Sequence, residues 1–520
     1  MPVSTDDIPL FDRDYIAAEI AASLLFLASE QNPDARETAY TIKSNIENSN
    51  FILNMLGQSL KNLCREEYDA IINRAKERLQ YRQAKLGQTS EEQATLHLYE
   101  AILEGVELLV SQILEIGNLP SYSGRFENAQ SAFSKVLELS NLSHGSVNNL
   151  TTTYPGPQHL ATLLMAVTGV LENASIQKIT PPNGVDDKKW RQWLGYRAKT
   201  KPILWPNHRQ ALANNFHETG TSAIMVLPTG AGKTTLSEVK IAGNLARSKN
   251  VIFLAPTNSL VEQLQADLGN AFPEELIGSS VSSDFDLILQ TESDFQPIEV
   301  MTPEKCLALL NFAPEAFKKV GLFIFDECHM LSPTAGSFRR ALDGMLCILA
   351  FQKLMVDAGQ QADFLFLSAM VDNATDFAEW IENFTQRPCL PIDLAWKPSR
   401  QARGIITYPQ NGLNSAIKRA FNIQKESGTK YISTAAKREL KATPHALFGM
   451  HHNWKPEIST DTKILKLLEH PIQLSGALKY KSPYITANAN TVAYELARHS
   501  ALSGLKTIVF VNKTDDTFKV

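Results

Sequence analysis

The sequence predicts an α/β fold, a parallel β-sheet with helices on both faces, preceded by an all-α N-terminal domain. Two observations support this prediction. Beyond residue 196, short apolar runs alternate with helical stretches, as in a parallel sheet that helices cover on both sides. Before residue 181, apolar residues recur at helical spacing instead. The predicted strands are 223–227, 251–255, 298–301, 322–325 and 364–367.

The helical region is predicted to extend from residue 14 to about residue 175. Ile16, Ile20 and Leu24 share one helical face, and similar spacings recur further along without a fixed-period repeat. The region holds no catalytic constellation, so we expect a helical accessory domain over residues 1–190.

Pro181-Pro182-Asn183-Gly184 ends the helical pattern, because proline cannot continue a helix and Asn-Gly favours a turn. We therefore place a domain boundary near 181–196. The α/β domain is expected to cover residues 196–403.

Composition limits the classes of function. The 520 residues, 44% of them hydrophobic, suggest two to four domains. A net charge of −5 and a pI of about 6.2 exclude a protein that binds nucleic acid over a broadly basic surface, so any such contact must be local. The five cysteines form no CxxC pair, which argues against a disulfide framework or zinc module. Without a signal-peptide pattern or a run of about 18 apolar residues, we expect a soluble, cytoplasmic protein with no membrane partner.

The first predicted strand leads directly into a glycine-rich loop and then a helix. Glycines let the backbone approach phosphates, while successive N–H groups and the helix N-terminus face the negative charge. Lys233 is expected to reach the β- and γ-phosphates, and the Thr234 hydroxyl to bind Mg²⁺. Leu227 stands where the general GxxxxGK[ST] pattern has its first glycine. The residues assigned to ATP binding are Thr229, Gly230, Ala231, Gly232, Lys233, Thr234 and Thr235.

A second element, 322–325 followed by Asp326-Glu327-Cys328-His329, is an apolar strand that ends in two carboxylates. Such residues at the end of a parallel strand lie in the crevice where ligands bind. Asp326 is expected to hold Mg²⁺ and Glu327 to orient and deprotonate the attacking water. The alternative, a solvated helix N-terminus, is less favoured because the pair follows Lys233 by 93 residues (326 minus 233) and spells Asp-Glu-Cys-His.

Together these motifs resemble those of superfamily 2 helicases, most closely the superkiller-type DExH group. The resemblance covers about residues 200–403 and 505–515. It implies a RecA-like parallel sheet of the P-loop NTPase type that uses ATP and Mg²⁺.

The same resemblance implies two loops that touch the backbone of a nucleic-acid strand. Hydroxyl and main-chain donors on such loops bind phosphate without a basic surface. The candidate residues are Pro256, Thr257, Ser259, Thr302 and Pro303.

Further roles follow from the resemblance. Ser368-Ala369-Met370 stands where the family has Ser-Ala-Thr, the motif that couples hydrolysis to strand movement, and Met370 lacks the usual hydroxyl. His329 is expected to bridge toward Ser368. Gln210, 23 residues before Lys233, is assigned to reading adenine. His445, His451 and His452 have no cysteine or carboxylate at a metal-ligand spacing and are left out.

The remainder of the chain divides into two expected parts. Residues 404–500 are a linker or insertion, partly helical and basic, whose charges form either a solvated helix face or a strand-binding surface. Residues 501–520 resemble the start of a truncated second RecA-like domain, with a buried strand at 506–512. We expect the 520 residues alone to hydrolyse ATP poorly, because the family's arginines that stabilise the γ-phosphate come later.

The predicted function is an ATP-dependent helicase or translocase on DNA or RNA, single-stranded or partly duplex. One alternative is the motor subunit of a restriction or anti-phage defence complex that serves a partner nuclease. Another, of a different class, is a scaffold in which ATP switches strand affinity without unwinding.

Overall fold

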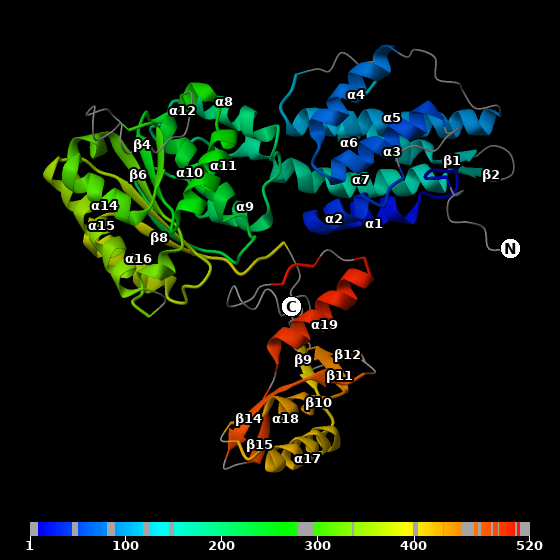
Figure 1. Cartoon of the computed structure of the whole chain (residues 1–520). Helices are drawn as coiled ribbons and strands as arrows, with labels where there is room; N and C mark the ends of the chain where they lie inside the picture. The colour runs from blue at the N-terminus through cyan, green and yellow to red at the C-terminus, as the bar shows by residue number, and fades with distance from the viewer. Residues whose placement is uncertain are drawn as a thin grey trace. The chain divides into compact units, whose positions relative to one another are not determined.

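The structure is a computed structural model, and it forms two compact units, residues 1–398 and 399–520. Figure 1 shows the order of their elements along the chain. The structure describes residues 9–43, 50–80, 89–117, 125–144, 150–278, 295–334, 337–398, 404–429, 431–449, 462–465, 470–479, 482–486, 488–504 and 507–509.

A six-stranded parallel sheet forms the centre of the region that follows the N-terminal helices, which confirms the predicted α/β fold. Its strand order is β5-β4-β6-β7-β3-β8, and every neighbouring pair is parallel. All five predicted strands are present, and one further strand, β8, pairs with β3 at the edge. The strands are β3 (Ser222–Val226), β4 (Asn250–Leu254), β5 (Ile298–Met301), β6 (Val320–Phe325), β7 (Asp363–Ser368) and β8 (Cys389–Asp393).

Side chains alternate between the two faces of this sheet, as the strand repeat requires. Ala223 and Met225 of β3 pack in one core, whereas Ile224 and Val226 pack in another. Helices α10 (Lys233–Ala246) and α11 (Asn258–Ala271) supply the first core, and α14 (Pro303–Phe312), α15 (Phe338–Asp357) and α16 (Ala374–Thr385) supply the second. The sheet is therefore covered on both faces, as Figure 1 shows.

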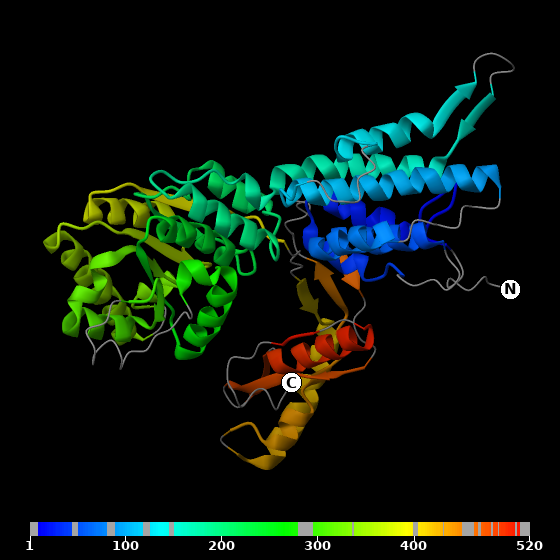
Figure 2. The same cartoon turned by 90° about the horizontal axis from the view of Figure 1, so that it is seen from above.

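The N-terminal region is helical as predicted, with one exception. A short antiparallel hairpin separates the last two long helices and appears as two cyan arrows in Figure 2. The elements are α1 (Ala18–Ala28), α2 (Asn32–Ala39), α3 (Phe51–Cys64), α4 (Tyr68–Gln80), α5 (Ser90–Ile113), α6 (Ala129–Leu139), β1 (Asn141–His144), β2 (Leu150–Thr153) and α7 (Pro155–Ala174).

The helical region and the sheet share one continuous hydrophobic core. At their junction, an isolated antiparallel bridge joins Ser175 to Ile203, and the segment between them contains the predicted boundary and helix α8 (Asp187–Ala198). Helix α8 is tied to the loop-bearing helix α10 by a buried pair, Arg197 Nε and Nη2 to Glu238 Oε2 and Oε1 at 2.8 and 2.9 Å. The division into domains 1–190 and 196–403 therefore stays a prediction.

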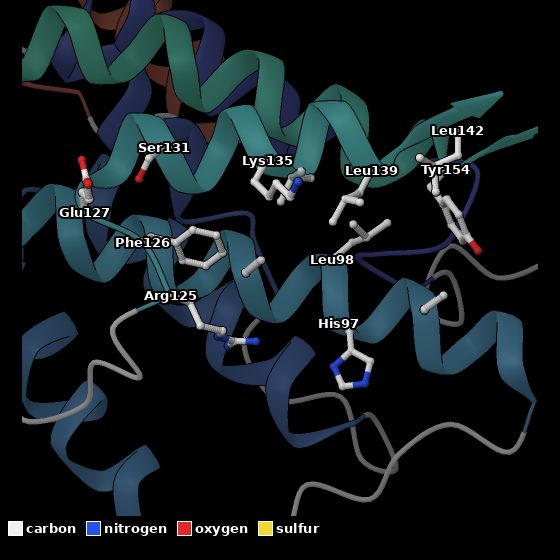
Figure 3. A pocket seen from close by; sticks show the side chains of 13 residues that line it. His97, Leu98, Arg125, Phe126, Glu127, Ser131, Lys135, Leu139, Leu142 and Tyr154 are labelled. Carbon is white, nitrogen blue, oxygen red and sulfur yellow. The ribbon is translucent and has the colours of Figure 1, made fainter.

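A cavity of about 680 Å³ opens between α5, α6 and the β1–β2 hairpin (Figure 3). Figure 3 shows Leu98, Phe126, Leu139 and Leu142 around it, with Lys135 also on its wall. The lining is mostly apolar. Among the residues that the structure describes, no group of three or more His, Cys, Asp or Glu side chains could hold a metal ion, and no helix could cross a membrane.

The second unit is small and mixed. Helix α17 (Gln410–Ser427) packs on α18 (Thr434–Arg438) and on the hairpin of β14 (Ser475–Lys479) and β15 (Ser482–Thr486). Strands β9 (Gly404–Thr407), β11 (Ala446–Gly449) and β12 (Thr462–Leu465) form a separate sheet, β10 (Lys441–Ala442) pairs with β13 (Ile472–Gln473), and α19 (Ala489–Leu502) follows.

The expected buried strand at 506–512 is not found where the structure describes it. Residues 507–509 have no strand assignment, and Ile508 is 80% exposed. A lone apolar strand needs neighbours to satisfy its backbone, and no strand is paired with these three residues. The other positions of that segment lie outside the described residues.

Candidate nucleotide-binding site

Five predicted motifs follow five strands at the same edge of the sheet. The order of the strands places the loops after β5 and β4 beside the Asp-Glu-Cys-His element after β6, then Ser368 at the end of β7, then the glycine-rich loop after β3. Backbone bonds join neighbouring motifs, because Leu227 N–H donates to Ser368 O at 3.1 Å and Asp326 N–H donates to Leu254 O at 2.9 Å. The carboxyl ends of the β-strands therefore form a row, with the candidate loops for nucleic-acid binding after β5 and β4 and the candidate motifs for nucleotide binding after β6, β7 and β3.

The glycine-rich loop has the backbone shape of a phosphate cradle. Gly230 and Gly232 have φ angles of 80° and 82°, which glycine adopts without steric cost. A Cβ at Gly230 would meet no atom within 4 Å, so the loop leaves open space beside it. Lys233 begins α10, and its Nζ lies 3.6 Å from Glu327 Oε1. The loop lysine thus faces the carboxylate after β6. A γ-phosphate bound by the loop would lie between these two side chains.

The two threonines after Lys233 differ. Thr235 is 8% exposed, and its Oγ1 accepts from Lys201 Nζ at 3.2 Å. Thr234 is only partly buried. Thr234 and Asp326 are the oxygen donors on this edge that would fit Mg²⁺, since hard cations prefer oxygen ligands. Their role, like that of Thr229 on the exposed part of the loop, stays a prediction.

Helix α9 (Pro206–Ala213) contacts the backbone of the glycine-rich loop through two side chains, a contact that the sequence did not predict. Asn207 Nδ2 donates to Ala231 O at 2.6 Å, and His208 Nε2 lies 3.2 Å from the same oxygen. Because the peptide is planar and trans, fixing the Ala231 carbonyl toward α9 points the Gly232 N–H the opposite way, toward the cradle. A Cβ at Gly232 would lie 2.2 Å from His208 Nε2, so only glycine fits.

The protonation state of His208 follows from its partners. Trp205 N–H donates to Nδ1 at 3.3 Å, so Nδ1 must be unprotonated and Nε2 must carry the hydrogen that reaches Ala231 O. His208 is 2% exposed, and burial lowers its pKa to about 4. The Trp205 ring stacks on the imidazole with 5.3 Å between ring centroids, and it lies tilted against Trp396 with 5.6 Å between ring centroids. The ring is therefore a neutral support for the loop.

A buried lysine joins α10 to the segment that precedes β3. Lys240 of α10 is 1% exposed, and its Nζ donates to the carbonyls of Phe216, Glu218 and Thr221 at 3.1, 3.0 and 2.6 Å. These carbonyls belong to the segment that enters β3. Burial lowers the pKa of Lys240 to about 8, which leaves the ammonium mostly charged at neutral pH.

The Asp-Glu-Cys-His element forms a sharp turn after β6. Glu327 has a φ of 51°, an uncommon conformation for a residue other than glycine, and Asp326 Oδ1 accepts its N–H at 2.9 Å. Burial and the neighbouring Glu327 raise the pKa of Asp326 to about 6. His329 Nδ1 lies 3.2 Å from Glu327 Oε2 and 3.3 Å from Ser368 Oγ. The expected contact between His329 and Ser368 is thus present, while its coupling role stays a prediction.

The remaining candidates are placed as follows. Gln210 is exposed on α9, while His208 two residues earlier contacts the loop. Cys328 is buried, and Ala369 is half-buried beside the exposed Met370. The adenine-reading role of Gln210 stays a prediction.

The two strand-loop threonines both begin helices. Thr257 Oγ1 accepts from Leu260 N–H, and Thr302 Oγ1 accepts from Lys305 N–H, each at 3.4 Å. Thr257 is exposed at the start of α11, and Thr302 is 8% exposed at the start of α14. Pro256 and Ser259 flank the first hydroxyl, and Pro303 follows the second. Each threonine therefore has a capping role that any test of strand binding must separate.

Comparisons with known proteins agree with this arrangement. Residues 206–377 match the family model for the DEAD/DEAH box helicase. Hachiman protein HamB of Bacillus cereus is 26% identical over 338 residues, 63% of this chain and 28% of that protein. ATP-dependent RNA helicase mtr4 of Schizosaccharomyces pombe is 23% identical over 230 residues, 44% of this chain and 19% of that protein. ATP-dependent DNA helicase Hel308 of Thermococcus kodakarensis is 28% identical over 212 residues, 40% and 17% respectively. The chain spans less than a third of each of these relatives.

Proposed function

We propose that this chain is the ATP-binding half of a superfamily 2 helicase motor that moves along nucleic acid. The observation that carries the proposal is the order β4-β6-β7-β3 at one edge of the sheet, which sets the strand loop, the two carboxylates, Ser368 and the glycine-rich loop side by side. Similarity to DExH-box helicases supports ATP use.

The chemistry assigned to ATP is divided between two neighbouring loops. Lys233 supplies a positive charge to the phosphates, and the Gly232 N–H is aimed by the hold of α9 on the preceding carbonyl. Mg²⁺, held by Thr234 and Asp326, would neutralise phosphate charge. Glu327, whose Oε1 lies 3.6 Å from Lys233 Nζ, would orient and deprotonate the water.

His329 is the candidate link between hydrolysis and movement. Its Nδ1 lies within 3.3 Å of both Glu327 and Ser368, so a change at the γ-phosphate that moves Glu327 would alter the bond to β7. Ser368 Oγ also accepts the Met370 N–H at 3.1 Å, which ties the ring contact to the backbone after β7. This path uses two residues of the Ser-Ala-Met motif and does not need a hydroxyl at Met370.

The strand is identified only as nucleic acid. The relatives named above include an RNA helicase and a DNA helicase, and the loop hydroxyls can bind phosphate of either polymer. Single-stranded DNA and RNA are therefore separate arms of the test.

The test measures ATP binding and hydrolysis by the natural protein with and without each strand, beside the variant Glu327→Gln. We expect a strand to raise hydrolysis in the parent. Glu327→Gln should bind ATP as the parent does but hydrolyse it about 10² to 10⁴ times more slowly, because an amide cannot accept the proton. Hydrolysis by Glu327→Gln at the parental rate would refute the assignment of the base.

Two other outcomes distinguish the alternatives. If ATP changes strand affinity without strand-stimulated hydrolysis, the protein is a nucleotide-switched scaffold and the motor proposal fails. If the strand stimulates hydrolysis and a separate nuclease co-purifies and cleaves only with ATP, the protein is the motor subunit of a defence complex. The match to Hachiman protein HamB extends over 338 residues, more than the 172 of the helicase match (206 to 377), so the likeness to that protein reaches beyond the helicase segment.

A further inference from the structure

The two units of the chain have net charges of opposite sign, although the net charge of the whole chain is small. Residues 399–520 contain 18 Lys and Arg against 8 Asp and Glu, a net charge of +10, while residues 1–398 contain 32 against 47, a net charge of −15. The unit with the ATP motifs is therefore acidic, and the small second unit is strongly basic. A basic domain of this kind attracts polyanions.

Within the second unit, polar and basic side chains line an open pocket of about 290 Å³. It lies between α18 and the start of the β14–β15 hairpin. Neither an aspartate nor a glutamate is among its lining residues. The polar members are Thr434, Lys437, Arg438, Gln473, Ser475 and Asn488.

The two cations of this pocket are available to a ligand. Lys437 and Arg438 are both exposed, and among the described residues neither has an ion-pair or side-chain hydrogen-bond partner. Arg419 on α17 is different, since its Nε lies 3.3 Å from Glu439 Oε2. Among the described residues of this unit, no carboxylate therefore neutralises the charge of the pocket.

The walls of the pocket are held in place. Gln473 Nε2 donates to the Lys437 and Leu440 carbonyls at 2.7 and 3.1 Å, which fixes the end of α18 against β13. A Cβ at Gly476 would lie 2.4 Å from Leu440 and 2.5 Å from the Tyr484 carbonyl, so glycine is needed for this approach. The basic pair is therefore presented on a fixed backbone.

Two exposed aromatic rings lie near the pocket in the chain. Tyr431, 78% exposed, precedes Thr434 by three residues, and Tyr484, 42% exposed, is opposite Ala477 in the hairpin that supplies Ser475. Exposed aromatic rings beside basic side chains are the usual elements of single-strand binding, because each base can stack on a ring while cations bind phosphate.

We propose that this pocket binds the phosphodiester backbone of single-stranded nucleic acid through Lys437 and Arg438. The inference rests on the proposed function and adds a second strand contact, separate from the loops after β4 and β5. Arg438 can form paired bonds to phosphate oxygens and Lys437 supplies a point charge. The hydroxyl and amide groups of the lining can donate to the same oxygens.

The experiment compares two double variants of the full chain that remove equal charge from the same unit. Lys437→Ala/Arg438→Ala empties the pocket of cations. Lys418→Ala/Lys425→Ala removes two exposed cations of α17 that do not line it. Binding of labelled single-stranded DNA and RNA is measured without nucleotide by fluorescence anisotropy across a salt series.

We expect the pocket variant to weaken binding about tenfold at low salt and to reduce the slope of log K against log salt by about 1.4, since each phosphate contact on a single strand contributes about 0.7. The α17 variant should change affinity by less than about twofold. Equal losses in both variants would overturn the proposal in favour of diffuse charge, and parental affinity and slope in the pocket variant would also overturn it.

An acidic polypeptide, polyglutamate, is the competing ligand class. If polyglutamate displaces the strand at equal charge concentration, the pocket is a protein-docking site and the proposal fails. The failure of the proposed function looks different, because the parent itself would then bind no strand or show no strand-stimulated hydrolysis. If Lys437→Ala/Arg438→Ala binds the strand as tightly as the parent does while Thr257→Val/Thr302→Val binds it more weakly, only the pocket proposal is refuted.

Discussion

Acidification tests the role of His208 as a neutral support for the glycine-rich loop. The ring titrates with a pKa of 6.5 when exposed and about 4 in the folded chain. Because the folded pKa is lowered, the unfolded state binds the proton first, and stability is lost as pH falls from 6.5 toward 4. Each pKa unit corresponds to about 1.4 kcal/mol, so this one residue should cost about 2 kcal/mol at pH 5 and about 3 kcal/mol below pH 4. Above pH 6.5 it should cost nothing.

The matched variant is His208→Gln. Its amide can still donate to Ala231 O but does not titrate in this range. We expect the variant to retain ATP affinity at pH 7 and to lose about 2 kcal/mol less than the parent between pH 7 and pH 5 in urea unfolding. Taking the difference between the two proteins removes the contribution of His217, whose pKa burial also lowers.

Equal losses of unfolding free energy in parent and variant between pH 7 and pH 5 would show that the ring is not held neutral, and the hydrogen-bond argument for the loop would be wrong. Loss of ATP affinity by the variant at pH 7 with unchanged stability would mean that an imidazole, rather than a donor at this position, is required.

Three further predictions concern the same unit. Lys233→Ala should abolish ATP binding in equilibrium dialysis, because the phosphates lose their main cationic partner; retained binding would contradict the loop assignment. Thr257→Val with Thr302→Val should weaken strand binding about ten- to a hundredfold and cost about 1 kcal/mol per lost cap, whereas the two serine variants should bind as the parent does; parental binding by the valine pair in filter assays would remove both hydroxyls from the interface. Arg197→Met should lower the unfolding free energy by about 2–4 kcal/mol, because the buried Glu238 then keeps only the longer pair to Lys201, whose Nζ lies 3.4 Å from Glu238 Oε1; a variant as stable as the parent would show that the Arg197–Glu238 pair is dispensable.

The strands and loops of the site could be predicted because their signals are local. Each predicted strand is an unbroken apolar run, and each motif follows its strand directly in the chain. Strand β8 was not predicted, since Pro391 and Asp393 interrupt its apolar pattern, which is tolerated at the edge of the sheet. The β1–β2 hairpin was missed for a similar reason, because its strands consist largely of Asn, Ser and Thr.

The support of the loop by α9 could not be predicted, because it is a contact between a side chain and a backbone carbonyl 23 residues away. The sequence assigned Gln210 of this helix to adenine, which stays a prediction, and gave no role to His208, which contacts the loop. Two residues along a helix correspond to about 200° of rotation, so the two side chains occupy opposite faces and a contact of one says nothing about the role of the other. Likewise, the net charge of −5 describes neither unit, and the division became visible only once the unit boundary was known.

The ammonium of Lys240 has a thermodynamic consequence for nucleotide affinity. It joins α10 to the segment that precedes β3. The strand, the glycine-rich loop and the helix are therefore linked at the end away from the loop as well as through the loop itself. A cradle fixed in this way loses little conformational entropy when ATP arrives, and more of the interaction free energy appears as affinity. All three N–H donors of the lysine are already bonded to carbonyls. A neutral side chain of equal length would leave these three acceptors without that donor and would no longer hold α10 against the segment that precedes β3.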